Sequence, residues 1–191
     1  AYGAHHLMGN ITGNQDRPRF TSLADGSLDV NEDMKFQGWT MDIQHSDDEG
    51  YAKMRLLMSY LMSVPGIPCV YYGDEIADVG GNDPDNRRMM RFDDLNAEER
   101  TTKEWTSAWA HLRTSRMSLL FGNTAFDILN DDVLHIERTY LDEVTHILLN
   151  RSDRPVAIPS SAMQPEDVLA GFLTDDGLLP PHGAVAFTSQ Q

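Results

Sequence analysis

The sequence predicts an α/β fold followed by a small all-β fold, because its hydrophobic pattern changes near residue 120. Before that point, short apolar runs typical of strands alternate with helical patterns. After it, short strand-like runs follow one another, separated by turn residues. The length of 191 residues suits one domain and part of another. We therefore expect two β/α units of a parallel sheet, and then a small antiparallel sheet or sandwich.

The first β/α unit is expected to contain a strand, a long polar loop and a helix. Residues 7–12 are expected to form the strand, and the loop covers residues 16 to about 45. Ser46 and Glu49 have the spacing of a capping box, which marks a helix start, and Pro65 marks its end. Five apolar side chains recur at helical spacing between them: Met54, Leu57, Met58, Leu61 and Met62.

The second unit is expected to begin with a strand over residues 67–72. This apolar run has the length and the β-branched and aromatic content of a strand buried on both faces. Cys69 lies within it and is expected in the core. A second loop covers 76–95, and Asn96 with Glu99 is expected to cap the next helix. The predicted apolar face of that helix consists of Trp105, Ala108, Trp109 and Leu112.

Beyond residue 120 the pattern is that of antiparallel hairpins. Residues 133–138 and 144–150 are expected to pair around a turn at 141–143. Residues 156–158, 167–170 and 184–187 are the other candidate strands.

Composition excludes several classes of partner. The chain has 30 acidic and 15 basic residues, giving a formal net charge of −15, whereas nucleic acid and anionic membrane surfaces require clustered cations. A neutral ligand such as a sugar remains compatible with this charge. A single cysteine excludes an internal disulfide and leaves the cellular compartment unassigned.

The common signatures of nucleotide, serine-hydrolase and zinc-protease sites are absent from the sequence. The adjacent histidines, His5 and His6, would point to opposite faces of a strand, so no shared metal ion is expected there. We therefore predict no metal ligands and no cofactor.

Polar side chains gather where the two predicted strands end. Because ligands of β/α proteins bind outside the carboxyl ends of the strands, these side chains are expected on one face. Amides, carboxylates and arginines there suit the vicinal hydroxyls of a sugar, although each group taken alone also fits a solvated loop or a local ion pair. The groups are Asn14, Gln15, Asp16 and Arg19 after the first strand, Asp74 and Glu75 after the second, and Asp83, Arg87 and Arg88 in the second loop.

Three segments carry a family resemblance. Residues 14–20 are Asn-Gln-Asp-Arg-Pro-Arg-Phe, residues 66–75 are Gly-Ile-Pro-Cys-Val-Tyr-Tyr-Gly-Asp-Glu, and residues 83–87 are Asp-Pro-Asp-Asn-Arg. The first two resemble the Asn-His-Asp-x-x-Arg and Gly-x-Pro-x-Ile-Tyr-Tyr-Gly-x-Glu segments at barrel strands 7 and 8 of the alpha-amylase family of glycoside hydrolases (family 13). The third resembles the Asp-Pro-x-x-Arg of its neopullulanase and cyclomaltodextrinase branch.

The resemblance implies the last two β/α units of a (β/α)8 barrel over residues 1–120, followed by the family's β-sandwich domain C over 121–191. Asp16 would be the third catalytic carboxylate, bonded to the 2- and 3-hydroxyls of the sugar at the cleavage point, and Asn14 and Gln15 would contact substrate. Asp83 and Arg87 would hold the next sugar. The supporting residues would be Arg19, Asp74 and Glu75. One departure is Gln15, which replaces the family's histidine and cannot carry a proton charge.

The resemblance also implies that the nucleophile and the acid/base, on barrel strands 4 and 5, lie in an upstream part of a longer enzyme. The parent would be a retaining α-glucan hydrolase that needs the rest of the barrel, and this part alone would be inactive. The family allows a calcium ion, but the spacing here shows no ligand set for one. Two alternatives stay open: a glucan transferase of the same family, and a sugar-binding module without catalysis.

Overall fold

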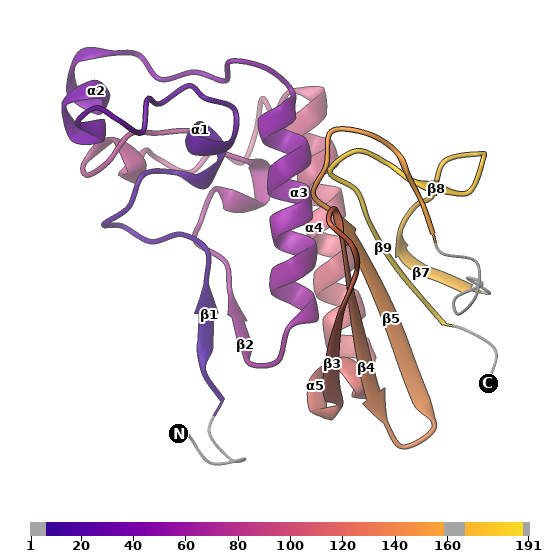
Figure 1. Cartoon of the computed structure of the whole chain (residues 1–191). Helices are drawn as coiled ribbons and strands as arrows, with labels where there is room; N and C mark the ends of the chain where they lie inside the picture. Colours follow the sequence, from indigo (N-terminus) through magenta and orange to yellow (C-terminus); the bar gives the residue numbers. More distant parts are fainter. Residues whose placement is uncertain (1–6, 159–166, 189–191) are drawn as a thin grey trace.

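The computed structural model describes residues 7–158 and 167–188, so His5 and His6 lie outside the described residues. Strands β1 (Gly9–Ile11) and β2 (Ile67–Cys69) pair in parallel, with Gly9 opposite Ile67. Both strands point toward the same end of the molecule, where the two long connections begin (Figure 1). The parallel pair predicted from the sequence is therefore present.

The connection after β1, expected to be a loop, contains two short helices. They are α1 (Phe20–Ala24) and α2 (Met34–Thr40). The Asp33 side chain accepts hydrogen bonds from the backbone N–H groups of Lys35 and Phe36 and so caps α2. The polar composition of this region predicted a loop and gave no sign of the two short helices.

Helix α3 (Glu49–Ser63) buries the predicted stripe, since Met54, Met58 and Leu61 are almost fully inaccessible. The predicted capping box is wrong. The helix begins after Asp48, and Ser46 instead donates its hydroxyl to the carbonyl of Asp25. The Asp25 carboxylate accepts from the Ser46 N–H at 3.3 Å, so a buried acid from the preceding loop holds Ser46 away from the helix.

Strand β2 is shorter and more exposed than predicted. It covers three residues, Ile67 is 52% exposed, and Cys69 is exposed rather than in the core. Within the described residues β2 pairs only with β1, so its other edge has no strand beside it. A buried parallel strand needs neighbours on both edges and cover on both faces, and the described part of the chain supplies one neighbour.

Two short 3-10 helices, η1 (Asp74–Ile76) and η2 (Asp85–Arg87), precede helix α4 (Ala97–Ser115). The predicted capping box of α4 is confirmed, because Asn96 and Glu99 each accept from the other's backbone N–H. The predicted apolar face is correct for Trp109 and Leu112 and wrong for Ala108, which is exposed. The buried face of α4 instead includes three polar side chains: Thr102, Thr106 and Arg113.

A short helix, α5 (Met117–Phe121), leads into the β part, a five-stranded antiparallel sheet in the order β3-β4-β5-β9-β7. Its strands are β3 (Asn123–Asn130), β4 (Val133–Tyr140), β5 (Glu143–Asn150), β7 (Asp167–Gly171) and β9 (Ala184–Thr188). The predicted hairpin is β4–β5, whereas β3 was not foreseen. A two-stranded sheet, β6 (Val156–Ala157) with β8 (Leu178–Leu179), forms a second layer, because Leu179 packs with Leu148 and Phe187.

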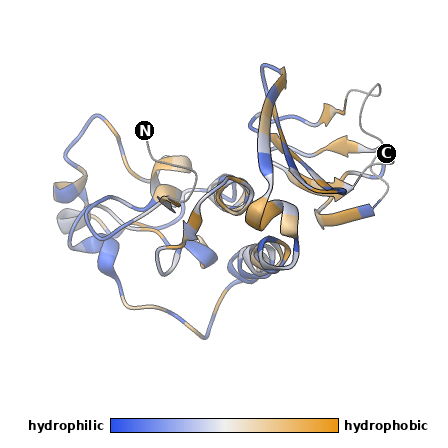
Figure 2. Cartoon of the chain, turned by 90° about the horizontal axis from the view of Figure 1, so that it is seen from below, coloured by the Kyte–Doolittle hydropathy of each residue, from blue (hydrophilic) through white to orange (hydrophobic). Residues whose placement is uncertain are grey.

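Helices α3 and α4 lie between the β1–β2 pair and the large sheet (Figure 1). One apolar cluster joins them, since Met62 and Trp109 from the helices pack with Ile136 and Ile147 from the sheet. The loops beyond the helices are largely hydrophilic, while the sheet strands are rich in apolar residues (Figure 2). Among the described residues no helix is long and apolar enough to cross a membrane.

Two buried arginines bind the C-terminal end of α3. Arg113 of α4 donates to the carbonyls of Met62, Val64 and Gly66. Arg138 of β4 donates to the carbonyl of Ser63 at 2.7 Å. Burial lowers the pKa of Arg138 to about 10, which still leaves it charged at neutral pH. The last turn of a helix has carbonyls without intrahelical partners and a negative dipole end, so it favours such cations.

Candidate active site

Asp16, Asp83 and Arg87 form an exposed ion-pair cluster beyond the ends of β1 and β2. The Arg87 Nη2 atom lies 3.0 Å from Asp83 Oδ1 and 3.5 Å from Asp16 Oδ1. The Asp16 side chain is 69% exposed and that of Asp83 is 37% exposed. Exposed ion pairs are weak, so these carboxylates can exchange part of their contact with arginine for the hydroxyls of a ligand.

Asn14 and Gln15 shape the turn that presents Asp16. The Asn14 Oδ1 atom accepts from the Asp16 backbone N–H at 2.8 Å, and Gln15 Nε2 donates to Asp16 Oδ2 at 3.1 Å. The Gln15 carbonyl in turn accepts from Arg87 Nε at 3.1 Å. The five residues predicted to be catalytic or substrate-binding are therefore brought together around one carboxylate.

Sequence reasoning missed two residues of this cluster. Asn86 is fully buried, and its Nδ2 atom donates to the carbonyls of Arg17 and Asn14, which ties η2 to the loop after β1. Lys35 of α2 lies 3.7 Å from Asp83 Oδ2 and adds a second cation. Asn86 lies inside the 83–87 motif, so the motif could have identified it as part of the site. No signal in the sequence indicates that Lys35 lies near Asp83.

Beneath the cluster, Arg19 and Asp74 form a buried ion pair at 3.0 Å, with both side chains at most 2% exposed. Arg19 also donates to the carbonyls of Tyr72 and Asn86, and its guanidinium lies 4.3 Å from the centre of the Tyr71 ring. Three chain segments therefore meet at one side chain. This position fits the support role predicted for Arg19 and Asp74.

The third predicted support residue, Glu75, accepts a hydrogen bond from the Gly73 N–H at 2.7 Å. Gly73 has a φ of +89°, a backbone conformation that favours glycine. Gly13, at the end of β1, faces the same place, because a Cβ there would lie 2.7 Å from Asp74 Oδ2. The two strand ends are thus held close together around Asp74.

Known proteins resemble this chain over most of its length. No protein-family model matches it. The cyclomaltodextrinase of Geobacillus thermopakistaniensis (strain MAS1) is 27% identical over 190 residues, which are 93% of this chain and 28% of that protein. The cyclomaltodextrin glucanotransferase of Bacillus sp. (strain 17-1) is 30% identical over 155 residues, or 76% of this chain and 21% of that protein.

The crystal structure of an alpha-amylase from Geobacillus thermoleovorans, complexed with acarbose, agrees with the fold. Its TM-score is 0.69 at 28% identity, and the match covers 97% of this chain and 39% of that one. This chain belongs to the alpha-amylase family of glycoside hydrolases. It spans about a quarter of the length of the two curated relatives and matches their C-terminal part.

In this alpha-amylase-family chain, burial raises the pKa of Asp74 to about 6. The Arg19 charge and its hydrogen bond lower that pKa, but they do not offset the loss of solvation. Asp74 Oδ1 accepts from Arg19, while Oδ2 has no hydrogen-bond partner among the described residues. The carboxyl that joins the two strand ends therefore changes its charge in mildly acidic solution.

We expect the Asp74 carboxyl to titrate near pH 6 in the folded protein, compared with about 4 in the unfolded chain. Because the folded state keeps this proton to higher pH, the contribution of Asp74 to the free energy of unfolding decreases by about 3 kcal/mol in all as pH rises from well below about 4 to well above about 6. A carbon-13 NMR titration of the aspartate carboxyls checks this, with Asp74→Asn identifying the resonance. A midpoint at or below about 4 would contradict it.

Proposed function

We propose that this chain supplies one side of the active site of a retaining α-glucan hydrolase, with Asp16 as its third catalytic carboxylate. The single observation that carries this is the cluster of Asp16, Asp83 and Arg87 beyond the ends of two parallel strands. Its substrate class would be starch-derived oligosaccharides, cyclodextrins or pullulan. The support from relatives is that two of the enzymes named above carry cyclomaltodextrin in their names and the third is complexed with acarbose.

The proposed architecture is an eight-stranded barrel whose last two strands are β1 and β2, within residues 1–120, followed by a β domain at 121–191. In the described residues each of these strands pairs only with the other. Apolar side chains of both strands are exposed, with Ile67 at 52% and Ile11 at 59%, and Met8, just before β1, is 52% exposed. Unpaired edges and bare apolar faces favour association with further strands, which the remaining barrel would provide.

Catalysis would need two further carboxyl groups. Retaining cleavage uses a nucleophile and an acid/base about 5–5.5 Å apart, on opposite sides of the scissile bond. We propose that both come from other barrel strands. Asp16 would bind the two neighbouring hydroxyls of the sugar as its ring flattens, and Asp83 and Arg87 would hold the adjoining sugar. These residues without the other two carboxyls would bind substrate and not cleave it.

A glucan transferase is the second candidate, favoured by the 30% identity to a cyclomaltodextrin glucanotransferase. The two reactions differ only in the acceptor, which is water in one and a sugar hydroxyl in the other. The residues around Asp16 bind the donor sugar and do not select between these acceptors.

The test is an analysis of products formed by the complete protein from maltoheptaose at high concentration. Hydrolysis with retention yields shorter oligosaccharides that first appear as the α-anomer in proton NMR. Longer or cyclic products would identify the transferase. Binding of maltoheptaose by calorimetry without any product would reject both enzymes and leave a sugar-binding module.

A further inference from the structure

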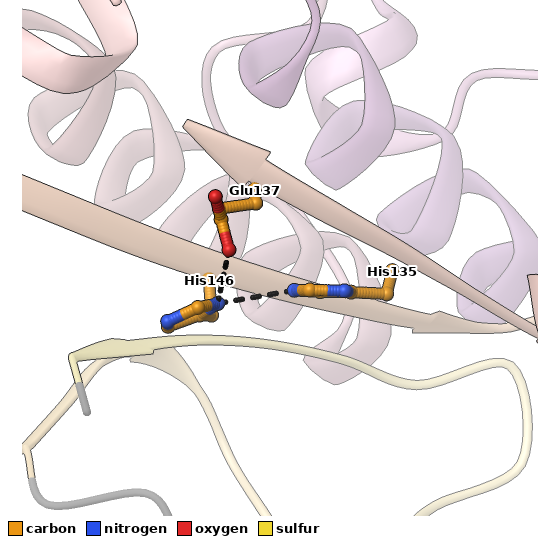
Figure 3. A group of neighbouring side chains, drawn as sticks. All are labelled: His135, Glu137 and His146. Atoms are coloured by element: carbon orange, nitrogen blue, oxygen red, sulfur yellow. Dashed lines mark hydrogen bonds and ion pairs between the residues drawn. The ribbon is translucent and has the colours of Figure 1, made fainter. Parts of the chain in front are cut away.

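Three side chains of the β4–β5 hairpin form a group of metal-ligand type, on the sheet face away from the helices. His135 and Glu137 are two residues apart on β4 and therefore point to the same face, and His146 of β5 lies opposite Glu137 in the register. Their neighbours Ile136 and Ile147 point the other way, into the cluster with Trp109. Figure 3 shows the three side chains directed at one another.

The distances within this group are close to those of a coordination site. His135 Nε2 lies 3.1 Å from His146 Nδ1, and Glu137 Oε2 lies 3.9 Å from the same nitrogen. All three donor atoms lie within 4.8 Å of one another. Two ligand atoms of a tetrahedral zinc site, with bonds of about 2.0–2.2 Å, are separated by about 3.3–3.6 Å. Small rotations of the Glu137 side chain would bring all three atoms to one ion.

The surroundings favour the neutral imidazoles that a metal ion needs. His135 is 9% exposed and His146 is 7% exposed, and the ring of His146 stacks on Phe187. Burial lowers the pKa of both histidines, which favours the neutral imidazole. The two facing nitrogens share a hydrogen bond, so one ring would change its tautomer when both bind a metal ion. Stacking and burial also fix the ring orientations, which lowers the entropy lost on coordination.

The group of His135, Glu137 and His146 also has a negative charge and is open to solvent. The side chain of Glu137 is 41% exposed, so it supplies a negative charge at the solvent edge. It borders a cavity of about 690 Å³ that also reaches His146 and gives an ion an entry path. Asp127 of β3 lies opposite His135 in the register and adds a second negative charge near the two rings.

We propose that His135, Glu137 and His146 bind one divalent transition-metal ion, zinc above all, and so link β4 to β5. Two imidazoles and one carboxylate are a ligand set that zinc favours, and hard ions such as calcium prefer oxygen ligands alone. A water molecule would occupy the fourth position. The proposal is independent of the sugar chemistry, because this group lies on the far side of the sheet from α3 and α4.

The test is a calorimetric titration of zinc chloride into the complete, untagged protein after treatment with a chelator. We expect one zinc ion to bind at this group and the thermal midpoint to rise with zinc. Glu137→Gln and His135→Gln should each weaken zinc affinity on the order of 100-fold or more. Changing a group that only hydrogen-bonds to a metal ligand already lowers metal affinity by about 10–100-fold, and losing a ligand itself should lower it further. The zinc-dependent rise in midpoint should disappear in both.

The matched controls remove the same chemical groups from exposed positions on α4: His111→Gln and Glu104→Gln. Both should bind zinc as the parent does. The Glu137→Gln variant keeps the side-chain shape at a half-exposed position, so its fold can be verified by circular dichroism without zinc. Parent-like zinc affinity in both ligand variants would overturn the proposal, as would a parent protein that binds no zinc.

Discussion

Replacing Asp16 with asparagine in the complete enzyme is expected to lower kcat by about 10²–10⁴ while KM changes little. A hydrogen bond to a charged group contributes about 1.5–3 kcal/mol, and Asp16 would make two of them to the reacting sugar. These bonds would strengthen as positive charge develops on the ring, so their loss raises the barrier more than it weakens substrate binding. Initial rates over a range of maltoheptaose concentrations separate the two constants.

The matched control is Asp42→Asn, an exposed acid in the same long connection whose contact is with the side chain of Gln44. Its turnover should equal that of the parent. An unchanged kcat in Asp16→Asn would remove Asp16 from the mechanism. A raised KM with unchanged kcat would assign it to ground-state binding alone.

Replacing Arg19 with methionine is expected to lower the free energy of unfolding by about 3–5 kcal/mol at neutral pH. The reason is the pair with Asp74, in which both side chains are at most 2% exposed. Without Arg19 the pKa of the buried Asp74 carboxyl would rise further and the group would take up a proton, and the carbonyls of Tyr72 and Asn86 would lose their donor. Urea unfolding followed by circular dichroism measures the loss.

Two comparisons identify the cause. Arg154→Met removes an exposed ion pair with Asp132, and it should cost less than about 1 kcal/mol. The double variant Arg19→Met with Asp74→Leu should recover part of the loss, because it also removes the buried carboxyl that is left without its partner. If Arg19→Met lowers the free energy of unfolding no more than Arg154→Met does, the buried pair of Arg19 and Asp74 does not hold the two strand ends together.

Elements that depend on local pattern could be predicted from the sequence. Helix α3 follows from the spacing of its apolar side chains, and α4 from the capping box of Asn96 and Glu99. The hairpin β4–β5 follows from two alternating runs around a short turn. In each case the interactions that define the element come from residues close together in the chain, so the sequence contains them directly.

The failures involve partners distant in the chain. Ser46 was expected to cap α3, but Asp25, 21 residues earlier, holds it. Residues 67–72 have the pattern of a strand with neighbours on both sides, and only one neighbour is described. The group of His135, Glu137 and His146 exists only when β4 and β5 pair in one register, and no spacing of single residues reveals it. Arg87 and Asp83 were found because a motif places them four residues apart.

The two buried arginines at the end of α3, Arg113 and Arg138, connect the sheet to the proposed sugar-binding face. Helix α3 ends at Ser63 and β2 begins at Ile67, so the carbonyls bound by Arg113 and Arg138 fix the segment from which β2 starts. The position of β2 in turn sets where Asp74 meets Arg19, directly below the exposed carboxylates. The C-terminal sheet therefore supports the position of the proposed site at the opposite end of β2. A protein cut after α5 would lose the alignment of that face together with its core.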